Sequence, residues 1–438
     1  MKTFKDLGLS EHIVNVLYSL DFTTPTEVQA RAIPLIIEGK DVVGLSQTGT
    51  GKTFAFALPM IEATEPAKYV QSLVLCPTRE LAEQILSEVK KITSKIEGVR
   101  AVAVYGGADM QRQIYNLKRG ANIVIGTPGR VLDHIKRKTL KLGLINRVVL
   151  DEADEMLNMG FRADIEEILR NTPTERQTIM FSATMSKDIL ALTKKYMLTP
   201  TTLQIGSPNT TIASVKQSYF VCQKDKKKRA LHALLSELPR GRTIIFCNTK
   251  KMVDSVQLYL KKMGFMALAL HGDMPQSVRK RVMNEYKEEL NNLLVTTDVA
   301  ARGIDVKDIM HVINFDLPQN NEYYIHRVGR TGRAGKTGNA YTLLNTPEQI
   351  EEIREIEKKT NSRITASTLA LNGFATEAKP QTHKPRGKKL NIKSREKRSI
   401  LSGRTSGSRY NHDINISGSS KIGKKKRTLR KTHKSKIR

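Results

Sequence analysis

Two adjacent acidic residues, Asp151 and Glu152, are the first candidates for chemistry in this chain. They follow residues 147–150, a mostly apolar stretch without alternation, which is typical of a parallel strand buried on both faces. Ligands of open α/β sheets bind beyond the carboxyl ends of the strands. One carboxylate could therefore hold magnesium, directly or through water, and the other could orient or deprotonate an attacking water. The alternative interpretation is a solvated acidic turn.

A glycine-rich turn at residues 47–53 is the second candidate. It lies between a short apolar stretch and a helical pattern, the context in which backbone N–H groups and a helix N-terminus bind a triphosphate. Lys52 would reach the β and γ phosphates, and the Thr53 hydroxyl would ligate magnesium. The general phosphate-loop pattern asks for glycine where this chain has Ser46. The context still favours a triphosphate site over a chance turn.

Three arginines at spacing three, Arg327, Arg330 and Arg333, form the third candidate. Arginines on a facing domain can clamp a γ-phosphate when two domains close. The alternative is a solvated basic loop, but the glycines interspersed among the arginines favour a tight, shaped turn.

Alternating apolar stretches and helical patterns must position these groups. The pattern breaks near residues 206–212 into turn-forming residues and then restarts, so we expect two doubly wound parallel α/β domains. The expected boundaries are 1–205, a linker at 206–213, 214–365, and a basic, disordered tail at 366–438. The expected strands lie near residues 41–46, 72–76, 101–105, 122–125, 148–150 and 178–181, then 242–247, 268–270, 293–295, 311–315 and 341–344.

The composition favours a polyanionic partner. The 438 residues carry a formal charge of +30, of which the last 60 residues contribute 21 Lys and Arg against 2 Asp and Glu. The sequence shows no membrane span and no signal peptide. Cys76, Cys222 and Cys247 are widely spaced, so we expect small core residues rather than disulfides or zinc ligands, in a reducing cytoplasm.

With these residues assembled, the chain resembles the bacterial-type DEAD-box ATP-dependent RNA helicases of superfamily 2 over about residues 1–365. The run Asp151-Glu152-Ala153-Asp154 is the family signature. The resemblance implies two tandem RecA-like domains, ATP and Mg²⁺ as cofactors, and RNA as the partner. The sequence leaves the oligomeric state open, and we expect a monomer. In this family, serine is a normal residue at the first position of the phosphate loop, which is Ser46 here.

The resemblance assigns the nucleotide site residue by residue. Gln29 would read the adenine edge, Phe4 would stack on the ring, and Asp305 would hold the ribose. Magnesium would be held by Thr53 and Asp151, partly through water. The residues implied for ATP are Phe4, Phe22, Gln29, Ser46, Gln47, Thr48, Gly49, Thr50, Gly51, Lys52, Thr53, Asp305, Arg330 and Arg333.

The catalytic set implied by the resemblance gives Glu152 the role of general base for water. Ser182 and Thr184 would couple hydrolysis to strand separation, and His326 would hydrogen-bond across the closed interface. Arg330 and Arg333 would be the arginine fingers. The full set is Lys52, Asp151, Glu152, Ser182, Thr184, His326, Arg330 and Arg333.

The RNA-binding set implied by the resemblance consists of hydroxyls, guanidiniums and glycine N–H groups at strand ends, which suit a phosphodiester backbone. Such contacts bind without sequence preference, and 2′-OH contacts would distinguish RNA from DNA. The set is Pro77, Thr78, Arg79, Gly106, Gly107, Thr127, Pro128, Gly129, Arg130, Asn248, Thr249, Gln276, Arg279, Thr297 and Arg302.

We therefore expect an RNA-stimulated ATPase that locally unwinds short RNA duplexes or remodels RNA–protein complexes, in ribosome assembly, mRNA decay or cold adaptation. One alternative is an ATP-gated RNA clamp with slow hydrolysis. A second is a DNA helicase, and a third is a structural ribosome-associated protein. The basic tail would tether the enzyme to structured RNA.

Overall fold

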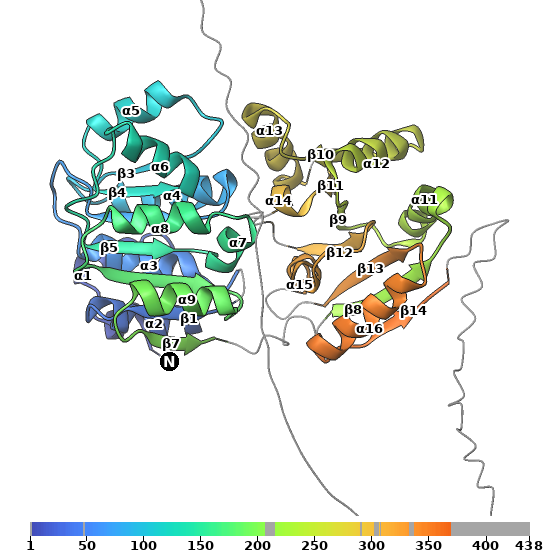
Figure 1. Cartoon of the computed structure of the whole chain (residues 1–438), viewed down its shortest axis with the longest axis horizontal. Coiled ribbons are helices and arrows are strands. Elements are labelled where there is room, and N and C mark those ends of the chain that lie inside the picture. The colour runs from blue at the N-terminus through green and yellow to red at the C-terminus, as the bar shows by residue number, and fades with distance from the viewer. Residues whose placement is uncertain are drawn as a thin grey trace, which may run out of the picture. The chain divides into compact units, whose positions relative to one another are not determined.

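Two parallel β-sheets, one in each half of the chain, form the framework of the protein (Figure 1). The computed structural model describes residues 2–46, 49–205, 215–289, 291–301, 306, 308–332 and 337–368. We call residues 2–205 the first half and residues 215–368 the second half. Each half contains one seven-stranded sheet, which confirms the expected α/β fold with two tandem doubly wound domains.

The first sheet has the strand order β3-β4-β2-β5-β6-β1-β7, and every pairing in it is parallel. β1 lies between β6 and β7, and β5 lies between β2 and β6. The strands are β1 (Val42–Leu45), β2 (Ser72–Leu75), β3 (Ala101–Val104), β4 (Ile123–Gly126), β5 (Arg147–Leu150), β6 (Gln177–Ser182) and β7 (Thr201–Gln204).

The second sheet has the order β10-β11-β9-β12-β13-β8-β14, which matches the first sheet strand for strand. β8 therefore occupies the position of β1, β9 that of β2, β12 that of β5, and β13 that of β6. The strands are β8 (Val215–Val221), β9 (Arg242–Phe246), β10 (Ala267–Leu270), β11 (Leu293–Thr296), β12 (Ile309–Asn314), β13 (Gly338–Leu344) and β14 (Ile364–Ala366).

Helices connect the parallel strands, as a parallel sheet requires. In the first half they are η1 (Phe4–Leu7), α1 (Glu11–Tyr18), α2 (Glu27–Ile37), α3 (Lys52–Glu62), α4 (Arg79–Thr93), α5 (Met110–Lys118), α6 (Pro128–Lys136), α7 (Ala153–Asn158), α8 (Arg162–Arg170) and α9 (Lys187–Tyr196). In the second half they are η2 (Lys224–Lys226), α11 (Lys227–Glu237), α12 (Lys250–Lys262), α13 (Gln276–Lys287), α14 (Asp298–Ala301), α15 (Asn321–Val328) and α16 (Glu348–Thr360).

Residues at the strand-to-helix junctions start the helices. Thr78 accepts a hydrogen bond from the Leu81 amide at the start of α4, and Thr249 accepts one from the Met252 amide at the start of α12. These side chains satisfy amides that have no partner within the helix. Some polar residues at the carboxyl ends of the strands are therefore needed to cap the helices that follow.

The central strands are buried on both faces, as their lack of alternation predicts. Every residue of β2 and β6 is buried, and apolar clusters cover both faces of each sheet. The three cysteines are free thiols inside these clusters, which confirms their interpretation as core residues: Cys76, Cys222 and Cys247. Within the described residues, no helix has the length and apolar character needed to cross a membrane.

Three strands, β7, β8 and β14, were not predicted from the sequence. In β7 only one of four residues is buried, and β14 has only three residues. β8 carries Lys216, Gln217 and Ser218 in its first half, so its apolar content is low. Edge and near-edge strands need less apolar surface, which explains why composition did not reveal them. The ordered second half reaches Ala366 of β14, one residue past the expected boundary; most of the expected linker and residues 369–438 lie outside the described residues.

Candidate nucleotide and RNA sites

The phosphate loop and the acidic cluster of the first half meet at one edge of the first sheet. β1, β5 and β6 are consecutive in the sheet order β5-β6-β1 and run parallel. The segments that leave their carboxyl ends therefore lie next to one another. These segments begin with Ser46, Asp151 and Ala183, which places the expected phosphate loop, acidic cluster and coupling loop together.

Asp154 fastens the loop that follows β6. Its Oδ2 accepts hydrogen bonds from the amides of Ala183 and Thr184, both at 3.0 Å, and from the Thr184 hydroxyl at 3.3 Å. Its Oδ1 accepts from the Glu155 amide at 3.1 Å. Ser182 Oγ donates to the Thr184 carbonyl at 2.7 Å. Any shift of this loop must therefore move or break contacts with the acidic cluster.

The backbone at Glu152 is held in a strained conformation. Its φ of 52° and ψ of 51° lie in the left-handed region, which residues with a Cβ rarely adopt. Asp151 stabilises this turn, because its Oδ1 accepts the Glu152 amide at 3.1 Å. Such strain costs of order 1–3 kcal/mol and concentrates at functional sites.

The electrostatics of the cluster favour a bound cation. Asp151 and Glu152 are 3% and 7% exposed, and burial raises the pKa of both carboxyl groups. The charge of Lys52 opposes this rise at both residues, and the charge of Arg330 opposes it at Glu152. Two buried carboxylates side by side are costly when ionised, so a further positive charge here would stabilise the ionised pair.

The phosphate loop is shaped to receive an anion. Gly51 has φ 91° and precedes α3, and Lys52, the first residue of α3, is 7% exposed with its Nζ 3.3 Å from the Ser46 carbonyl oxygen. Ser46 Oγ is buried and has no hydrogen-bond partner among the described residues. An unpartnered buried hydroxyl beside a buried lysine indicates room for ligand oxygens. Gln47 and Thr48 lie outside the described residues, whereas Gly49, Thr50 and Thr53 lie within them.

Gln29 ties the first helices to the phosphate loop. Its Oε1 accepts the Thr26 amide at 2.9 Å and its Nε2 donates to the Gly51 carbonyl at 3.1 Å. A Cβ at Gly51 would lie 2.8 Å from Gln29 Nε2, so glycine is required both for the positive φ and for this contact. Gln29 therefore links the segment expected to read adenine to the loop expected to bind the phosphates.

The two aromatic residues expected at the nucleotide site, Phe4 for stacking on adenine and Phe22 without an assigned role, differ in position. Phe4 is 1% exposed and packs inside the core of the first half, so its ring presents no open face. Phe22 is half-buried and packs edge-to-face on Phe54 with ring centroids 4.8 Å apart. The expectation that Phe4 stacks on the base does not fit this placement, because its ring fills the core; Phe22 is the candidate that remains.

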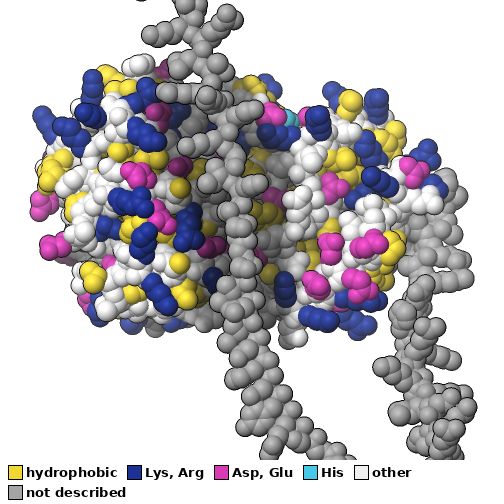
Figure 2. Space-filling view, in the orientation of Figure 1, with side chains coloured by type: hydrophobic (Ala, Val, Ile, Leu, Met, Phe, Trp, Pro, Cys, Tyr) yellow, Lys and Arg dark blue, Asp and Glu magenta, His cyan; other side chains and the backbone are white. Residues whose placement is uncertain are grey.

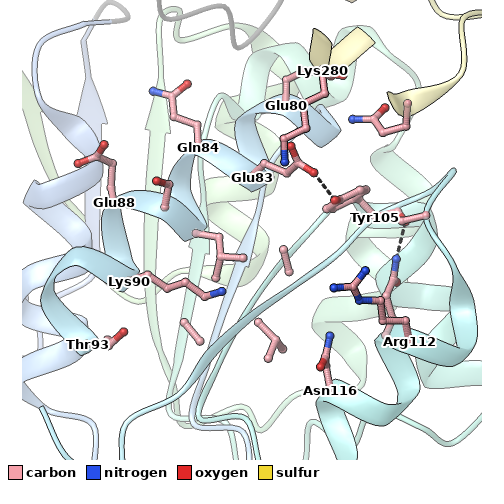
Figure 3. A pocket seen from close by; sticks show the side chains of 18 of the residues that line it. Glu80, Glu83, Gln84, Glu88, Lys90, Thr93, Tyr105, Arg112, Asn116 and Lys280 are labelled. Carbon is pink, nitrogen blue, oxygen red and sulfur yellow. Dashed lines mark hydrogen bonds between the residues drawn. The ribbon is translucent and has the colours of Figure 1, made fainter. Parts of the chain in front are cut away.

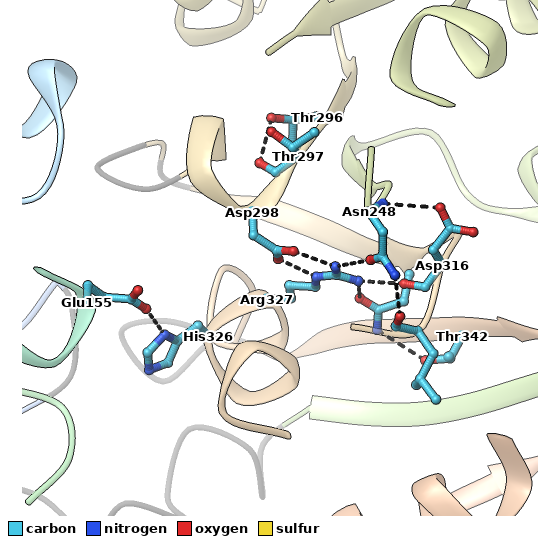
Figure 4. Close-up of polar contacts among 11 residues, drawn as sticks. Glu155, Asn248, Thr296, Thr297, Asp298, Asp316, His326, Arg327 and Thr342 are labelled. Carbon is cyan, nitrogen blue, oxygen red and sulfur yellow. Dashed lines mark hydrogen bonds and ion pairs between the residues drawn. The ribbon is translucent and has the colours of Figure 1, made fainter. Parts of the chain in front are cut away.

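The arginine-rich segment splits into different environments. Arg330 is 7% exposed, and Arg333 lies outside the described residues, as does Asp305. His326 Nδ1 contacts Glu155 Oε1, a residue of α7 in the first half (Figure 4). Burial lowers the pKa of His326, but the Glu155 hydrogen bond and the nearby carboxylates outweigh it and raise the pKa overall. His326 thus makes the contact between the halves that its resemblance predicted.

Arg327 is not available to a phosphate. It is 1% exposed, and its guanidinium donates to Asp298, Asn248, Asn314 and the Asp316 carbonyl (Figure 4). All five N–H groups of an arginine can be accounted for by these contacts. Neither earlier interpretation, a phosphate clamp or a solvated loop, fits Arg327, because it is a buried structural residue of the second half.

The RNA-contact candidates of the first half are joined by side-chain contacts. Arg79 fills the space that a Cβ on Gly107 would need, since that Cβ would lie 2.0 Å from its Nη1. Arg130 donates to the Ala108 carbonyl at 3.2 Å and to Gln113 at 3.3 Å. The loop therefore lies against Arg79 at Gly107 and is bonded to Arg130 at Ala108. The neighbouring candidates at the same strand ends are Pro77, Thr78, Thr127, Pro128 and Gly129.

In the second half, the candidates lie after β9 and β11 and at the start of α13. Asn248 is fully engaged: Oδ1 accepts from Arg327 and Nδ2 donates to the Leu317 carbonyl. Arg279 is 6% exposed and pairs with Glu80 at 2.7 Å, and Gln276 lies three residues before it on α13. The remaining candidates are Thr249, which caps α12, Thr297, which precedes α14, and Arg302, which lies outside the described residues.

Sequence reasoning missed several residues that position the site. Asp154 belongs to the acidic run but was given no role of its own, although a fixed spacing from Asp151 could have indicated one. Glu80, Gln113 and Asp298 hold Arg279, Arg130 and Arg327 respectively. Their partners are between 17 and 199 residues away, so nothing in the local sequence identified them.

Two family models match the chain: DEAD/DEAH box helicase over residues 26–192, and helicase conserved C-terminal domain over residues 226–335. The DEAD-box ATP-dependent RNA helicase CshA of Geobacillus kaustophilus (strain HTA426) is 44% identical over 365 residues, covering 83% of this chain and 78% of the relative. CshA of Bacillus subtilis (strain 168) is 44% identical over 363 residues, covering 83% and 73%. The structure of S. cerevisiae Dbp5 bound to RNA and ADP BeF3 is similar with a TM-score of 0.77 and 32% identity, covering 84% of this chain and 96% of that one.

Proposed function

Because the chain belongs to the DEAD-box family of ATP-dependent RNA helicases, we propose that it hydrolyses ATP in response to RNA and locally unwinds short RNA duplexes or remodels RNA–protein complexes. On this proposal, ATP and RNA binding close the two halves, and hydrolysis reopens them. We propose that this activity serves ribosome assembly, mRNA decay or cold adaptation in the cytoplasm.

One observation supports this proposal more than the others: Asp154 joins the acidic cluster directly to the loop of Ser182 and Thr184. A change at the nucleotide therefore has a hydrogen-bonded route to the coupling loop. Within the same turn, Glu152 is buried and strained, as a positioned general base is. A mere ATP-binding fold would need neither feature.

The residues divide the work as follows. Lys52 binds the phosphates through its ammonium group, and Gln29 orients the base side of the pocket from its position on Gly51. Glu152 accepts the proton of the attacking water, for which its carboxylate must be ionised. Arg330, whose charge acts on the Glu152 carboxyl, stabilises the charge that develops at the γ-phosphate.

The donor atoms present fit a magnesium ion. Thr53 offers a hydroxyl and Asp151 a carboxylate, and Mg²⁺ is usually held by one or two carboxylates together with water and substrate phosphates. The described residues contain no cluster of three or more His, Cys, Asp or Glu that could hold a metal, in keeping with such a sparse donor set. Magnesium would neutralise phosphate charge there.

The experiment that tests the proposal is an ATPase assay on the purified full chain without nucleic acid, with RNA and with DNA. The matched variant is Glu152→Gln, which keeps the size of the side chain and removes its basicity. We expect strong stimulation by RNA alone and its loss in the variant. A duplex-unwinding assay over several turnovers, with the same two proteins, tests the helicase step.

Each other outcome supports an alternative. Equal stimulation by DNA would favour a DNA helicase. RNA binding that depends on ATP, with hydrolysis too slow for repeated unwinding, would favour an ATP-gated clamp. The absence of ATP hydrolysis with any nucleic acid would contradict the proposal and leave a structural role on the ribosome.

The basic tail, residues 366–438, would serve as an electrostatic tether to structured RNA; residues 369–438 lie outside the described residues. A tail of this charge releases counterions when it binds, so progressive removal of its lysines should reduce the salt dependence of RNA binding. An unchanged salt slope would remove the tether from the proposal.

A further inference from the structure

The exposed face of α5 carries positive charge, and the carboxylate at its start, Asp109, bonds the backbone amide of Arg112 rather than its guanidinium. Arg112, Tyr115 and Arg119 lie at helical spacing on this face, and each is exposed, Tyr115 to 59%. The helix itself contains no Asp or Glu. Among the described residues, neither arginine forms an ion pair. Figure 2 shows Lys and Arg side chains on the part of the surface where Figure 1 places α5.

Exposed arginines elsewhere in the first half differ in this respect. On α8, Arg162 pairs with Glu166 at 3.2 Å and Arg170 pairs with Glu167 at 3.0 Å. On α6, Arg137 pairs with Asp133 at 2.6 Å. Intrahelical pairs of this kind are the usual arrangement on a solvated helix face. The face of α5 lacks them, so its guanidiniums remain available to an external anion.

An aromatic ring lies among these charges. The Arg119 guanidinium lies over the Tyr115 ring, 5.7 Å from its centroid. Arg100 extends the basic surface, since its Nη1 donates to the Arg119 carbonyl at 3.4 Å. Exposed aromatic rings interleaved with arginines are the chemistry that binds single-stranded nucleic acid, with bases on the rings and phosphates on the guanidiniums.

The face begins where the RNA-contact candidates of the first half end. α5 follows the loop of Gly106 and Gly107 directly, and Asp109 caps it by accepting the Arg112 amide at 2.6 Å. From Arg112 to Arg119 the helix advances about 10 Å. A strand that leaves the glycine loop along α5 would therefore meet Arg112 first, then Tyr115, then Arg119.

A cavity lies beside the start of this face. It has a volume of about 1080 Å³, with Arg112 and Asn116 of α5 on one wall and Glu83 and Glu88 of α4 on the other (Figure 3). Glu83 accepts a hydrogen bond from the Tyr105 hydroxyl, and Glu88 pairs with Lys91. Lys90 of α4 also lines the cavity, and the Arg112 guanidinium adds a positive charge on the α5 wall that would attract a phosphate.

We propose that the exposed face of α5, formed by Arg112, Tyr115 and Arg119, is an auxiliary binding surface for the single-stranded RNA that extends beyond the Gly106–Gly107 loop. Tyr115 stacks on a base, and the two arginines bind the backbone. The inference rests on the proposed RNA-dependent function and adds a second contact region to it. It predicts that long RNA binds more tightly than the core site alone allows.

The test is the salt dependence of RNA binding by the full chain with a non-hydrolysable ATP analogue, measured by fluorescence anisotropy. Two oligouridines are compared, of about 6 and about 16 nucleotides, within the range of single-strand site sizes. With the longer RNA, the double variant Arg112→Gln, Arg119→Gln should lower the magnitude of the slope of log K against log salt by about 1.4. Each lost phosphate contact accounts for about 0.7 of this change. Tyr115→Ala should weaken binding about tenfold, and Tyr115→Phe should not, because stacking needs only the ring.

The control is Arg162→Gln with Arg170→Gln, which removes two exposed but ion-paired arginines from α8 and should leave the slope unchanged. Binding of the shorter RNA and its stimulation of the ATPase should be normal in every variant. An unchanged slope with the longer RNA would overturn the inference and leave α5 to a partner other than RNA. Equal losses with both lengths would overturn it too, since α5 would then belong to the core site. Failure of the unmodified chain to bind RNA would contradict the proposed function itself.

Discussion

The two halves carry a buried lysine and an aspartate at equivalent places, but they use them in opposite ways. In the first half, Lys52 begins the helix after β1 and Asp151 follows β5. In the second half, Lys227 begins the helix after β8, and Asp316 follows β12. Lys52 Nζ lies 3.3 Å from the neutral Ser46 carbonyl oxygen, whereas Lys227 Nζ pairs with Asp316 at 3.1 Å.

The connection before each lysine explains the difference. The segment before Lys52 contains Gly49 and Gly51, both with positive φ, and leaves room for phosphates. The segment before Lys227 consists of residues 222–226 and contains no glycine, and the lysine lies 5.0 Å from the Phe315 ring centroid. Where no ligand can enter, the two charges neutralise each other. The sheet therefore places the lysine and the aspartate in both halves, whereas the loop before the lysine determines whether these residues bind a ligand or stabilise the fold.

The largest expected effect is on catalysis by the first lysine. Lys52→Ala should lower kcat/KM for ATP by about 100- to 1,000-fold, because it removes a preorganised cation from the phosphate site. The free energy of unfolding should fall only slightly, because Lys52 forms no ion pair among the described residues, although its charge offsets part of the burial cost of the Asp151 and Glu152 carboxylates. RNA-stimulated ATPase assays and urea unfolding measure the two quantities. Retained activity would break the comparison by making Lys52 structural.

The equivalent change in the second half should affect stability instead. Lys227→Met should lower the free energy of unfolding by about 3 kcal/mol, because it leaves Asp316 partly buried without its cation. The KM for ATP of the folded fraction should stay the same. Chemical denaturation followed by ATPase assays at a temperature where the variant is folded checks both. A raised KM with normal stability would place Lys227 in a binding site.

A smaller effect concerns the loop after β3 and its counterpart after β10. Gly107→Ala should raise the RNA concentration for half-maximal ATPase stimulation about tenfold, since the new Cβ displaces Arg79 and a phosphate contact is lost. Gly160→Ala has a similar φ of +83° with open space around it, and controls for backbone strain. Gly272→Ala, after β10, places its Cβ at an ordinary 3.7 Å from Lys250. Both controls should leave the RNA concentration unchanged. A shift with Gly160→Ala would show that backbone strain is the cause, and a shift with Gly272→Ala would show that an added Cβ without a close contact is enough.

The smallest expected effect is a stability change from the buried carboxylates. Their folded-state pKa is raised, so ionisation costs stability above that pKa, and the cost is lost as pH falls through it. Glu152→Gln should therefore raise Tm by a few degrees at neutral pH, and the gain should vanish in acid, where the carboxyl is protonated. Thermal unfolding from pH 4 to pH 8 measures this, with Glu166→Gln as a control of opposite sign, since its neighbours lower the pKa of Glu166 to about 2. The ATPase rate should also decline as the pH falls, and this decline should begin at a higher pH than an ordinary carboxylate would give.

The sequence by itself determined the fold class and most of the site. Continuous apolar stretches predicted β2, β4, β5, β6, β9 and β11, because strands buried on both faces need such residues. Chemistry at strand ends brought Lys52, Asp151 and Glu152 together, since parallel strands deliver their carboxyl ends to one edge. Local composition could not reveal β8 or β14, whose positions depend on their neighbours in the sheet.

Only the tertiary structure decided which polar groups are available to ligands. Arg327 and Arg330 each begin an Arg-x-Gly repeat. The guanidinium of Arg327 nevertheless bonds Asp298 and Asn248, residues that lie 29 and 79 positions away along the chain. Phe4 in the core and Lys227 in its ion pair with Asp316 are likewise surrounded by residues that are distant along the chain. Hydrogen bonds and ion pairs act over a few ångströms in space regardless of separation along the chain, so the partners of a side chain follow from the fold and not from its neighbours in sequence.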